Sequence, residues 1–411
     1  MRRKCTDSLI QWKKNLNRHP LLLQGLRQTG KTWLALDFAE KNYKNTLYLN
    51  LETDKPVADY LSVPRPPQDA LLFLETYAGK PLLPSVSLLI LDNIQCVPKL
   101  STLLAALSLD YPQYHIIAIH RGLASPELYS KNDFHIISLY PLDFEEFLWA
   151  NAEYALSREI RRHFSTLTPL GKELHQKALS QFYLYLVTGG MPLSVLEYRR
   201  EKKLLMVPDI QQKLLELILS DISSQAPTGM TRHCQNAWLS IPAQLEKSSR
   251  RFQYSLITKG ATAKTYEKPL DWLLRSGYAL ACRQTSLHLY PTDCGLCARV
   301  LGVPSYQLLT GSDTPAARAC TETFLAQHFT RNGYTLSYWS SGNQAEVPFL
   351  LEKEGRHIAV DYRLTPHQKT RNLTRFRAEM NTNAEMYLLS VEDFREKENY
   401  HIVPVYAGFC V

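Results

Sequence analysis

The sequence lacks any long apolar run, and its N-terminal segment lacks an apolar core. No stretch approaches the roughly 20 apolar residues that a membrane-spanning helix needs. The segment MRRKCTDSLIQWKKN carries basic residues with no apolar stretch behind them, which excludes a secretory signal peptide. We therefore expect a cytoplasmic protein that does not enter a membrane.

The cysteines are dispersed along the chain. The eight cysteines lie far apart in 411 residues, which excludes the disulfide framework of a small secreted domain. Only Cys294 and Cys297 are close, and the stretch DCGLCARVLG has no second Cys or His pair nearby that would complete a metal site. Because Leu and Val continue a helical pattern there, we interpret the pair as buried thiols on a helix.

The bulk composition is that of an ordinary globular protein. With 45% hydrophobic and 21% charged residues, the chain can build real cores, and its length allows about two to four domains. The net charge of +8 fits a mildly basic cytosolic protein and also a protein that meets DNA or another polyanion. The charge alone does not choose between these interpretations.

Five short apolar runs punctuate the N-terminal third, and most are separated by segments with helical spacing. This alternation predicts a parallel α/β sheet that is covered on both faces. The runs are PLLLQ (20–24), TLYLNLE (46–52), LPSVSLLILD (83–92), YHIIAIH (114–120) and FHIISLY (134–140).

After Pro141 the pattern changes to long helices and then to a second α/β segment. We expect helices over residues 142–156, 171–187 and 209–225. Residues 235–293 have the order helix, short helix, helix and two strands, which is typical of a winged helix-turn-helix. From residue 315 onward, one helix precedes the strands LSYWS, AEVPFLLEKEG, RHIAVDYRL, AEMYLLSV and HIVPVYA.

The stretch GLRQTGKT (25–32) fits the phosphate-loop pattern GxxxxGK[ST], with a strand before it and a helix after it. Glycines let the backbone wrap round a phosphate, and the helix offers its positive N-terminal end. Lys31 is placed to reach the β- and γ-phosphates of ATP, and the Thr32 hydroxyl to bind Mg²⁺. The expected nucleotide contacts are Gly25, Arg27, Gln28, Thr29, Gly30, Lys31, Thr32 and Trp33.

The run LLILDNIQ (88–95) ends a buried strand with Asp92. An Asp that ends a later strand of the same sheet is the natural partner of Thr32 in holding Mg²⁺. A plain strand-ending Asp at a turn is the alternative, and the phosphate loop upstream favours the metal role.

With these residues in view, the chain resembles a prokaryotic family of AAA-type, STAND-like ATPases that carry a C-terminal domain of uncharacterised function. The resemblance covers almost the whole sequence. Its markers are PLLLQGLRQTGKTWL, LLILDNIQ, LYPLDFEEFL, GGMP, SIPAQLEK, FQYSLITKGA, LDWLLRSGYAL and YWSSGNQAEVPFLLE.

The resemblance implies an α/β fold with four parts. They are a P-loop ATPase domain with a parallel sheet (1–160), a helical lid (161–226), a winged helix (227–310) and a small nuclease-like α/β domain (311–411). In the family, the residue after the metal-side acid is typically Glu, which activates the attacking water. Here it is Asn93, which cannot accept a proton but can hold a water by hydrogen bond.

Two further sites can be compared with the family: the end of the fourth strand departs from its pattern, and the GGMP turn matches it. At the end of the fourth strand, relatives have a Gly-Ser pair, where this chain has Ile119-His120-Arg121. Either His120 or Arg121 contacts the γ-phosphate, or the loop is merely remodelled. The turn ending at Pro192 matches GGMP and is similar to a STAND lid element near the adenine, with a plain helix–helix turn as the alternative.

The C-terminal domain of the family resembles PD-(D/E)xK nucleases, in which carboxylates hold Mg²⁺ and a Lys steadies the hydroxide. Here Pro348 replaces the central acid and also lacks a strand donor. Arg363 replaces the Lys and is a poor proton partner because of its high pKa. Glu346 lies two residues from Pro348 on the same strand face and could replace the lost metal ligand, although a structural role is favoured. The matching positions are Glu322, Glu346-Val347-Pro348-Phe349 and Asp361-Tyr362-Arg363, and we expect an inactive site.

Two segments are candidates for DNA contact. The third helix of the winged segment, about 263–276, offers polar side chains but contains Pro269, which costs about 3 kcal/mol inside a helix or splits it. Internal packing is an equal alternative for this helix, and a solvated face is the alternative for residues 363–377. The basic candidates are Lys264, Lys268 and Arg275 in the first segment, and Arg363, Lys369, Arg371, Arg375 and Arg377 in the second.

The leading hypothesis is an ATP- and Mg²⁺-binding switch protein with slow or lost hydrolysis. The runner-up is a working ATPase whose base is another acid, such as Glu52, or comes from a neighbouring subunit. A DNA-binding or DNA-cleaving effector, in which Asp361 holds a metal, is the third hypothesis. No arginine finger stands out in the sequence, so a homo-oligomer and a separate partner protein both remain open.

Overall fold

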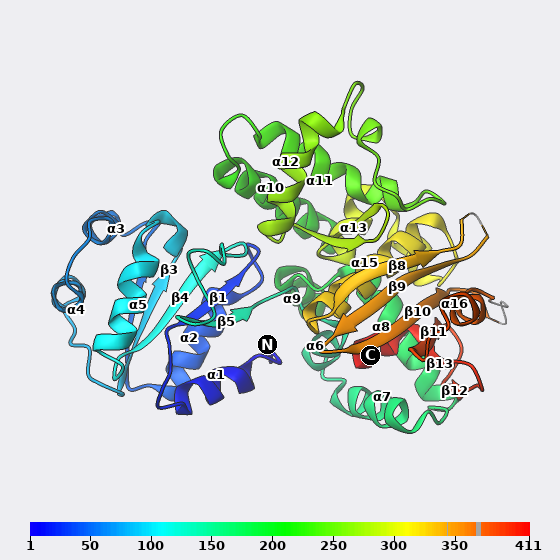
Figure 1. Ribbon diagram of the computed structural model, residues 1–411. Coiled ribbons are helices and arrows are strands. Elements are labelled where there is room, and N and C mark those ends of the chain that lie inside the picture. The colour runs from blue at the N-terminus through cyan, green and yellow to red at the C-terminus, as the bar shows by residue number, and fades with distance from the viewer. Residues whose placement is uncertain (343, 367–370) are drawn as a thin grey trace. The chain divides into compact units, whose positions relative to one another are not determined.

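The computed structural model describes residues 1–342, 344–366 and 371–411. It divides into two compact units, which are described separately below (Figure 1). One holds residues 2–140 with the short stretch 275–277, and the other holds residue 1 with residues 141–274 and 278–411. The first unit therefore ends before the predicted domain boundary at residue 160, and the division into four domains stays a prediction.

The first unit is built on a five-stranded parallel sheet with the order β2-β3-β4-β1-β5. β3 is buried at every position, as an apolar run inside a parallel sheet should be. All five strands predicted from the sequence are present: β1 (Leu21–Gly25), β2 (Asn45–Asn50), β3 (Ser87–Asp92), β4 (His115–Arg121) and β5 (His135–Ser138).

Helices cover both faces of this sheet. Because successive strand residues point to opposite sides, each strand contributes side chains to two cores. Leu22 and Leu89 belong to one core, and Leu21 and Leu88 belong to the other. The first core also takes residues from α3 (Lys55–Ser62), α4 (Pro67–Ala78) and α5 (Leu100–Asp110), and the second takes residues from α1 (Thr6–Lys14) and α2 (Lys31–Asn42). This confirms the parallel α/β layer predicted from the sequence.

The strand register brings the carboxyl ends of four strands to one edge of the sheet. Asn50 pairs with Asp92 across β2 and β3, and Asp92 pairs with Ile119 of β4. Gly25, at the end of β1, pairs with Arg121 of β4. Residues that are far apart in the sequence therefore share one edge, and this edge carries the candidate site.

The second unit begins with helices, one of which is broken where the sequence predicted continuity. The helix expected over residues 142–156 ends at Ala150 and restarts at Tyr154, because Ala152 adopts a left-handed conformation with φ +65°. The helices are α6 (Phe144–Ala150), α7 (Tyr154–Thr166), α8 (Lys172–Thr188), α9 (Pro192–Glu201) and α10 (Val207–Gln225).

The next segment has the predicted order of two helices, with a short helix between them, and a two-stranded hairpin. Pro269 lies inside the last helix of this set, and that helix continues through it. The elements are α11 (Thr231–Leu245), the 3₁₀ helix η2 (Tyr254–Leu256), α12 (Ala263–Arg275), β6 (Ala279–Arg283) and β7 (Leu287–Pro291). The order matches a winged helix, and that assignment itself stays a prediction.

The C-terminal part forms a mixed six-stranded sheet with the order β12-β13-β11-β10-β9-β8, in which β10–β11 and β11–β13 are the parallel pairs. The predicted last strand, HIVPVYA, stops at Pro404, and residues 405–410 form the 3₁₀ helix η3 instead. The elements are α13 (Cys294–Leu301), α14 (Ser305–Leu309), α15 (Pro315–Arg331), β8 (Thr335–Ser340), β9 (Glu346–Lys353), β10 (Arg356–Arg363), α16 (Asn372–Met380), β11 (Glu385–Ser390), β12 (Arg395–Glu396) and β13 (His401–Pro404).

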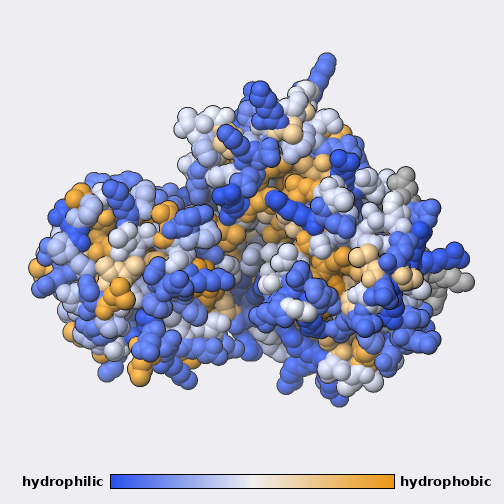
Figure 2. Space-filling view, viewed as in Figure 1, coloured by the Kyte–Doolittle hydropathy of each residue, from blue (hydrophilic) through white to orange (hydrophobic). Residues whose placement is uncertain are grey.

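Two predictions about apolar residues can be checked directly. Cys294 and Cys297 are both buried on α13, as expected for structural thiols. Within the described residues, no helix has the length and apolar character that a bilayer crossing requires. On the face drawn in Figure 2, apolar side chains are interspersed with hydrophilic ones.

Candidate functional site

The phosphate loop leaves β1 through a glycine that no other residue can replace. Gly25 has φ +141°, and a Cβ there would lie 2.2 Å from the Leu139 carbonyl oxygen. Gly30 precedes α2 with φ +92°, so the loop turns sharply before Lys31. The sequence Gly-x-x-x-x-Gly-Lys-Thr thus builds a cradle at the N-terminus of a helix, where backbone N–H groups favour an anion.

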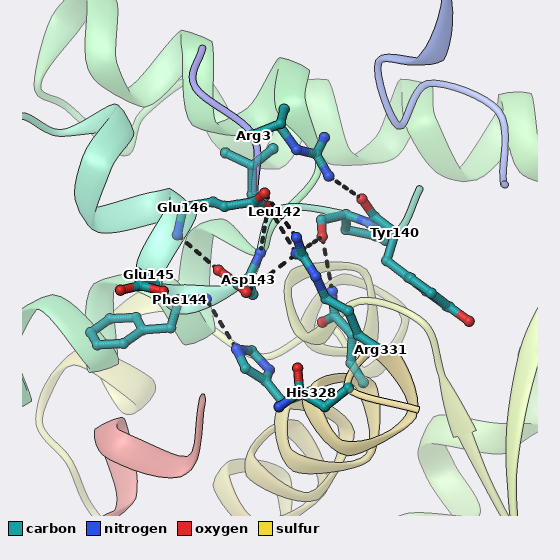
Figure 3. Close-up of polar contacts among 12 residues, drawn as sticks. Arg3, Tyr140, Leu142, Asp143, Phe144, Glu145, Glu146, His328 and Arg331 are labelled. Atoms are coloured by element: carbon teal, nitrogen blue, oxygen red, sulfur yellow. Dashed lines mark hydrogen bonds and ion pairs between the residues drawn. The ribbon is translucent and has the colours of Figure 1, made fainter. Parts of the chain in front are cut away.

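The middle of the loop is held from within and from the N-terminal segment. Thr29 is buried, and its hydroxyl donates to the Leu26 carbonyl at 2.9 Å. Arg3 donates to the Thr29 carbonyl at 2.9 Å. Arg3 also donates to the Tyr140 carbonyl at 2.6 Å (Figure 3). Gln28 is exposed at the tip with φ +66°. Arg27 is half-buried, and Trp33 is 47% exposed.

The predicted phosphate and metal ligands lie together at the sheet edge. Lys31 Nζ donates to the carbonyls of Gly25 and Leu26, both at 2.7 Å. The Thr32 hydroxyl donates to Asp92 Oδ2 at 2.6 Å. These oxygens are the hard ligands that Mg²⁺ prefers, and a nucleotide-bound Mg²⁺ takes its other ligands from phosphate and water. The residues therefore fit ATP with Mg²⁺.

Tyr48 is a partner of Asp92 that the sequence did not reveal. Its phenol donates to Asp92 Oδ2 at 3.0 Å from β2, the neighbouring strand. Burial raises the pKa of Tyr48, and the Asp92 carboxylate raises it further. The phenol therefore stays protonated and remains a hydrogen-bond donor to the metal-side acid.

The Asn93 side chain forms hydrogen bonds with three neighbouring side chains. It adopts a left-handed conformation with φ +58° at the start of the short helix η1 (Ile94–Cys96). Its Nδ2 donates to Asn50 Oδ1 at 2.9 Å, and its Oδ1 accepts from Arg121 Nη2 at 3.0 Å and from Gln95 Nε2 at 3.3 Å. The amide therefore uses both its donor and its acceptor at the water-activating position.

Arg121 and Glu52 form an ion pair on the same edge. Arg121 Nη2 lies 2.6 Å from Glu52 Oε2, and the Arg121 side chain is only 10% exposed. The hydrogen bond from Arg121 holds the pKa of Glu52 below its usual value. Arg121 is therefore a cation beside the phosphate loop, and Glu52 is an ionised acid that is paired with Arg121.

His120 contributes a neutral ring to this region. Its Nδ1 lies 3.3 Å from the Gly122 carbonyl, and the ring packs edge-on against Tyr129. Burial lowers the pKa of His120 to about 4, although the Gly122 carbonyl opposes the shift. At neutral pH the ring is therefore uncharged, and Arg121 is the cationic member of the Ile119-His120-Arg121 run.

The GGMP turn packs tightly within the second unit. Gly190 N donates to Asp293 Oδ2 at 2.6 Å, and a Cβ on Gly190 would lie 2.0 Å from the Leu142 carbonyl oxygen. Pro192 is buried and begins α9. These contacts support the helix–helix turn, and the adenine contact of Pro192 stays a prediction.

Charged residues of the LYPLDFEEFL marker belong to a buried network (Figure 3). Arg331 of α15 forms two hydrogen bonds of 2.8 Å with the Glu146 carboxylate and lies 3.4 Å from Asp143 Oδ2. Asp143 caps α6 by accepting from Glu146 N at 2.8 Å, and His328 Nε2 accepts from Phe144 N at 3.1 Å. Asp143 and Glu146 therefore join α6 to α15.

Several residues that match nuclease positions in the sequence line one pocket of about 230 Å³. Asp361 Oδ1 accepts from Arg363 Nη1 at 2.8 Å, and Asp361 Oδ2 accepts from Asn372 Nδ2 at 3.2 Å. The Asp361 carboxylate is thus engaged by a cation and an amide of the protein. The pocket is lined by Arg250, Asp313, Arg318, Glu346, Pro348, Asp361, Tyr362, Arg363, Leu364 and Asn372.

This pocket does not fit a divalent metal ion. Pro348 lines it without offering a ligand, and Arg363 pairs with the Asp361 carboxylate. Burial raises the pKa of Glu346, which opposes its ionisation. Across the described residues, no group of three or more His, Cys, Asp or Glu side chains is arranged to hold a metal.

Comparisons with known proteins bear on parts of the chain. Residues 17–148 match the family model described as an AAA domain. The segment that carries the phosphate loop is therefore similar to an AAA domain. Residues 179–307 match a model described as a domain of unknown function (DUF8612), and no curated protein matches the chain.

Several solved structures resemble the chain at low similarity. The Aeropyrum pernix ORC1 protein in complex with DNA has 14% identity and a TM-score of 0.31, covering 75% of this chain and 95% of that one. Drosophila ORC bound to DNA has 15% identity and a TM-score of 0.29, covering 72% and 94%. C. elegans PCH-2 has 14% identity and a TM-score of 0.25, covering 38% and 47%. Likenesses of this size carry no functional argument.

The basic candidates for DNA contact fall into different settings. Lys264 and Lys268 are exposed on α12. Arg375 pairs with Glu379 at 2.5 Å, and Arg377 contacts Asn399 at 3.4 Å. Lys369 lies outside the described residues, so a continuous basic track over residues 363–377 stays a prediction.

Proposed function

We propose that the AAA-type domain binds ATP with Mg²⁺ and uses the nucleotide mainly as a conformational ligand, with slow hydrolysis. The observation that carries the proposal is Asn93, which follows the metal-side Asp92 and is tied to Asn50 and Arg121. An amide cannot take a proton from water at neutral pH. The geometry thus supports phosphate and metal binding while the water-activating position holds no base.

The groups of this edge have defined tasks toward a nucleotide. Mg²⁺, when bound, would supply positive charge beside the phosphate groups. Thr32 and Asp92 would exchange their mutual hydrogen bond for that ion. Lys31 would leave the carbonyls of Gly25 and Leu26 for phosphate oxygens. Each of these exchanges replaces an internal contact with a contact to the ligand.

Arg121 links nucleotide binding to conformation in this proposal. A ligand shifts a conformational equilibrium only by binding one state better than another. The Arg121 guanidinium bridges Glu52 and Asn93, and an incoming γ-phosphate would compete with Glu52 for it. The ends of β2, β3 and β4 would then report whether the phosphate is present.

The test is ATP binding by calorimetry beside ATP turnover, on the wild type and three variants. We expect tight binding with slow turnover in the wild type, loss of binding in Lys31→Ala, and faster turnover in Asn93→Glu, since a general base typically contributes about 10²–10⁴-fold. Lys41→Ala, an exposed lysine of the same helix, is the matched control. Absence of ATP binding contradicts the proposal, and turnover that Asn93→Glu leaves unchanged contradicts its hydrolytic part.

The C-terminal sheet is, in the same proposal, a nuclease-like fold whose site is inactive. Support comes from Pro348 and from the pairing of Asp361 with Arg363. We expect no cleavage of plasmid DNA with Mg²⁺ or Mn²⁺. Cleavage by the wild type that disappears in Asp361→Ala would overturn this part.

A DNA-binding module is the second candidate, favoured by the exposed lysines of α12. Phosphate contacts release counterions, so affinity for DNA should fall steeply with salt. We expect Lys264→Ala with Lys268→Ala to weaken DNA retention and to lower its salt dependence. Retention that is equal in the wild type and the double variant would exclude α12 as the contact.

A further inference from the structure

Arg250 extends from the connection between α11 and η2 into the pocket of the C-terminal sheet. Its Nε donates to Glu322 Oε1, its Nη1 donates to Glu346 Oε1 at 2.8 Å, and its Nη2 donates to the Tyr362 hydroxyl at 3.4 Å. Its side chain is 21% exposed. One guanidinium therefore contacts three groups that lie on α15, β9 and β10.

The two carboxylates converge on the guanidinium from different elements. Glu322 is 1% exposed in the middle of α15, and its Oε1 also accepts from the Tyr362 hydroxyl at 2.6 Å. Glu322 Oε2 is buried and has no hydrogen-bond partner within the described residues. A buried carboxylate in this state depends on its remaining charge partner, because an unpaired buried charge is strongly unfavourable.

Glu322 matches the helix acid of the nuclease comparison, and Glu346 lies two residues before Pro348, the position of the missing central metal ligand. The fit to a metal fails there. Pro348 offers no ligand, and Asp361 is taken by Arg363 and Asn372. What the two glutamates share instead is Arg250. A planar guanidinium with several donors matches carboxylates in this way better than an ammonium group does.

We propose that the Arg250 guanidinium is the resident cation of this pocket in place of a divalent metal ion. It pairs with the carboxylates of both Glu322 and Glu346, and it ties the α11–η2 connection to the C-terminal sheet. This inference rests on the proposed inactivity of the C-terminal site and names Arg250 as the residue that occupies it. The contacts of Arg250 do not depend on nucleotide binding.

The experiment compares thermal unfolding and Mn²⁺ binding, the latter by electron paramagnetic resonance, in the full chain. Arg250→Ala should lower the unfolding temperature by several degrees, and Arg251→Ala, at an exposed neighbour, should not. Adding Glu322→Gln to Arg250→Ala should restore part of the loss, because the buried charge is removed with its partner. The wild type should bind no Mn²⁺ at this pocket.

Arg250→Lys serves if Arg250→Ala fails to fold, since it keeps the charge and loses the multiple contacts. It should unfold between the wild type and Arg250→Ala, or below the wild type if the alanine variant yields no folded protein. A wild type that binds Mn²⁺ in a manner abolished by Glu346→Gln overturns the proposal. So does an Arg250→Ala protein as stable as Arg251→Ala. DNA cleavage by a wild type that binds no Mn²⁺ at this pocket would instead contradict only the proposed inactivity.

Discussion

Arg121 and Glu52 are joined by a contact of 2.6 Å between Nη2 and Oε2, at the sheet edge that carries the phosphate loop. The same nitrogen lies 3.0 Å from Asn93 Oδ1. An acid engaged in this way is a poor base, because the guanidinium stabilises its ionised form and lowers its pKa. The pair therefore bears on the alternative that Glu52 replaces the missing water-activating residue.

Glu52→Gln should change ATP turnover by less than about tenfold, whereas removal of a working general base costs about 10²–10⁴-fold. The measurement is steady-state phosphate release with saturating ATP·Mg²⁺. Glu40→Gln, at an exposed acid on α2, is the control. A hundredfold fall in Glu52→Gln alone would identify Glu52 as the base and favour the working-ATPase alternative.

Arg331→Met should destabilise the protein strongly. Its partners Glu146 and Asp143 are 0% and 2% exposed, and breaking a buried pair from one side costs about 3–5 kcal/mol. Arg356→Met breaks the exposed pair with Glu385 and should cost about 1 kcal/mol or less. Urea unfolding of both variants provides the measurement. Equal losses in the two variants would contradict the assignment of the α6–α15 network as a buried one.

Gly190→Ala should impair folding because its new Cβ would meet the Leu142 carbonyl oxygen at 2.0 Å. Gly229→Ala is the control, since its φ is +82° but no atom lies within 4 Å of the added Cβ. Gly190 has no positive φ, so only the control carries the strain of a left-handed backbone, and a larger loss in Gly190→Ala reflects the clash. Yield of folded protein and its unfolding temperature should be lower for Gly190→Ala, and the reverse order would show that the turn can relax.

His120 should make stability depend on pH. Its folded pKa of about 4 lies below the ordinary value of 6.5, so the folded state favours the neutral ring. The stabilisation is fully present above pH 6.5 and is lost as the pH falls toward 4. His120→Asn removes this contribution, so the difference in unfolding free energy between wild type and variant should shrink over that window. A difference that is constant with pH would show that the ring titrates normally.

Much of the first unit could be predicted from the sequence, because its signals are local. The five strands follow from short apolar runs, and the phosphate loop is one continuous stretch whose ligands Lys31 and Thr32 are adjacent. The link from Thr32 to Asp92 also follows, since parallel strands present their carboxyl ends at one edge.

The remaining contacts could not be predicted, because nothing in the local pattern marks them. Arg3 reaches the phosphate loop across 26 residues, and Arg121 reaches Glu52 across 69. Arg250 meets Glu322 across 72 residues, from within the segment predicted as a winged helix. Such pairs depend on tertiary packing, which brings together side chains with no common periodicity.

Trp33 gives the protein a native optical probe. Of the six tryptophans, all within the described ranges, Trp33 alone is exposed, at 47%, and it directly follows Thr32. Its emission should therefore be open to quenching by acrylamide, while the other indoles are shielded to a greater degree. Nucleotide arrival at the neighbouring threonine can then be followed as a change in Trp33 quenching in unlabelled protein, with Trp33→Phe giving the background.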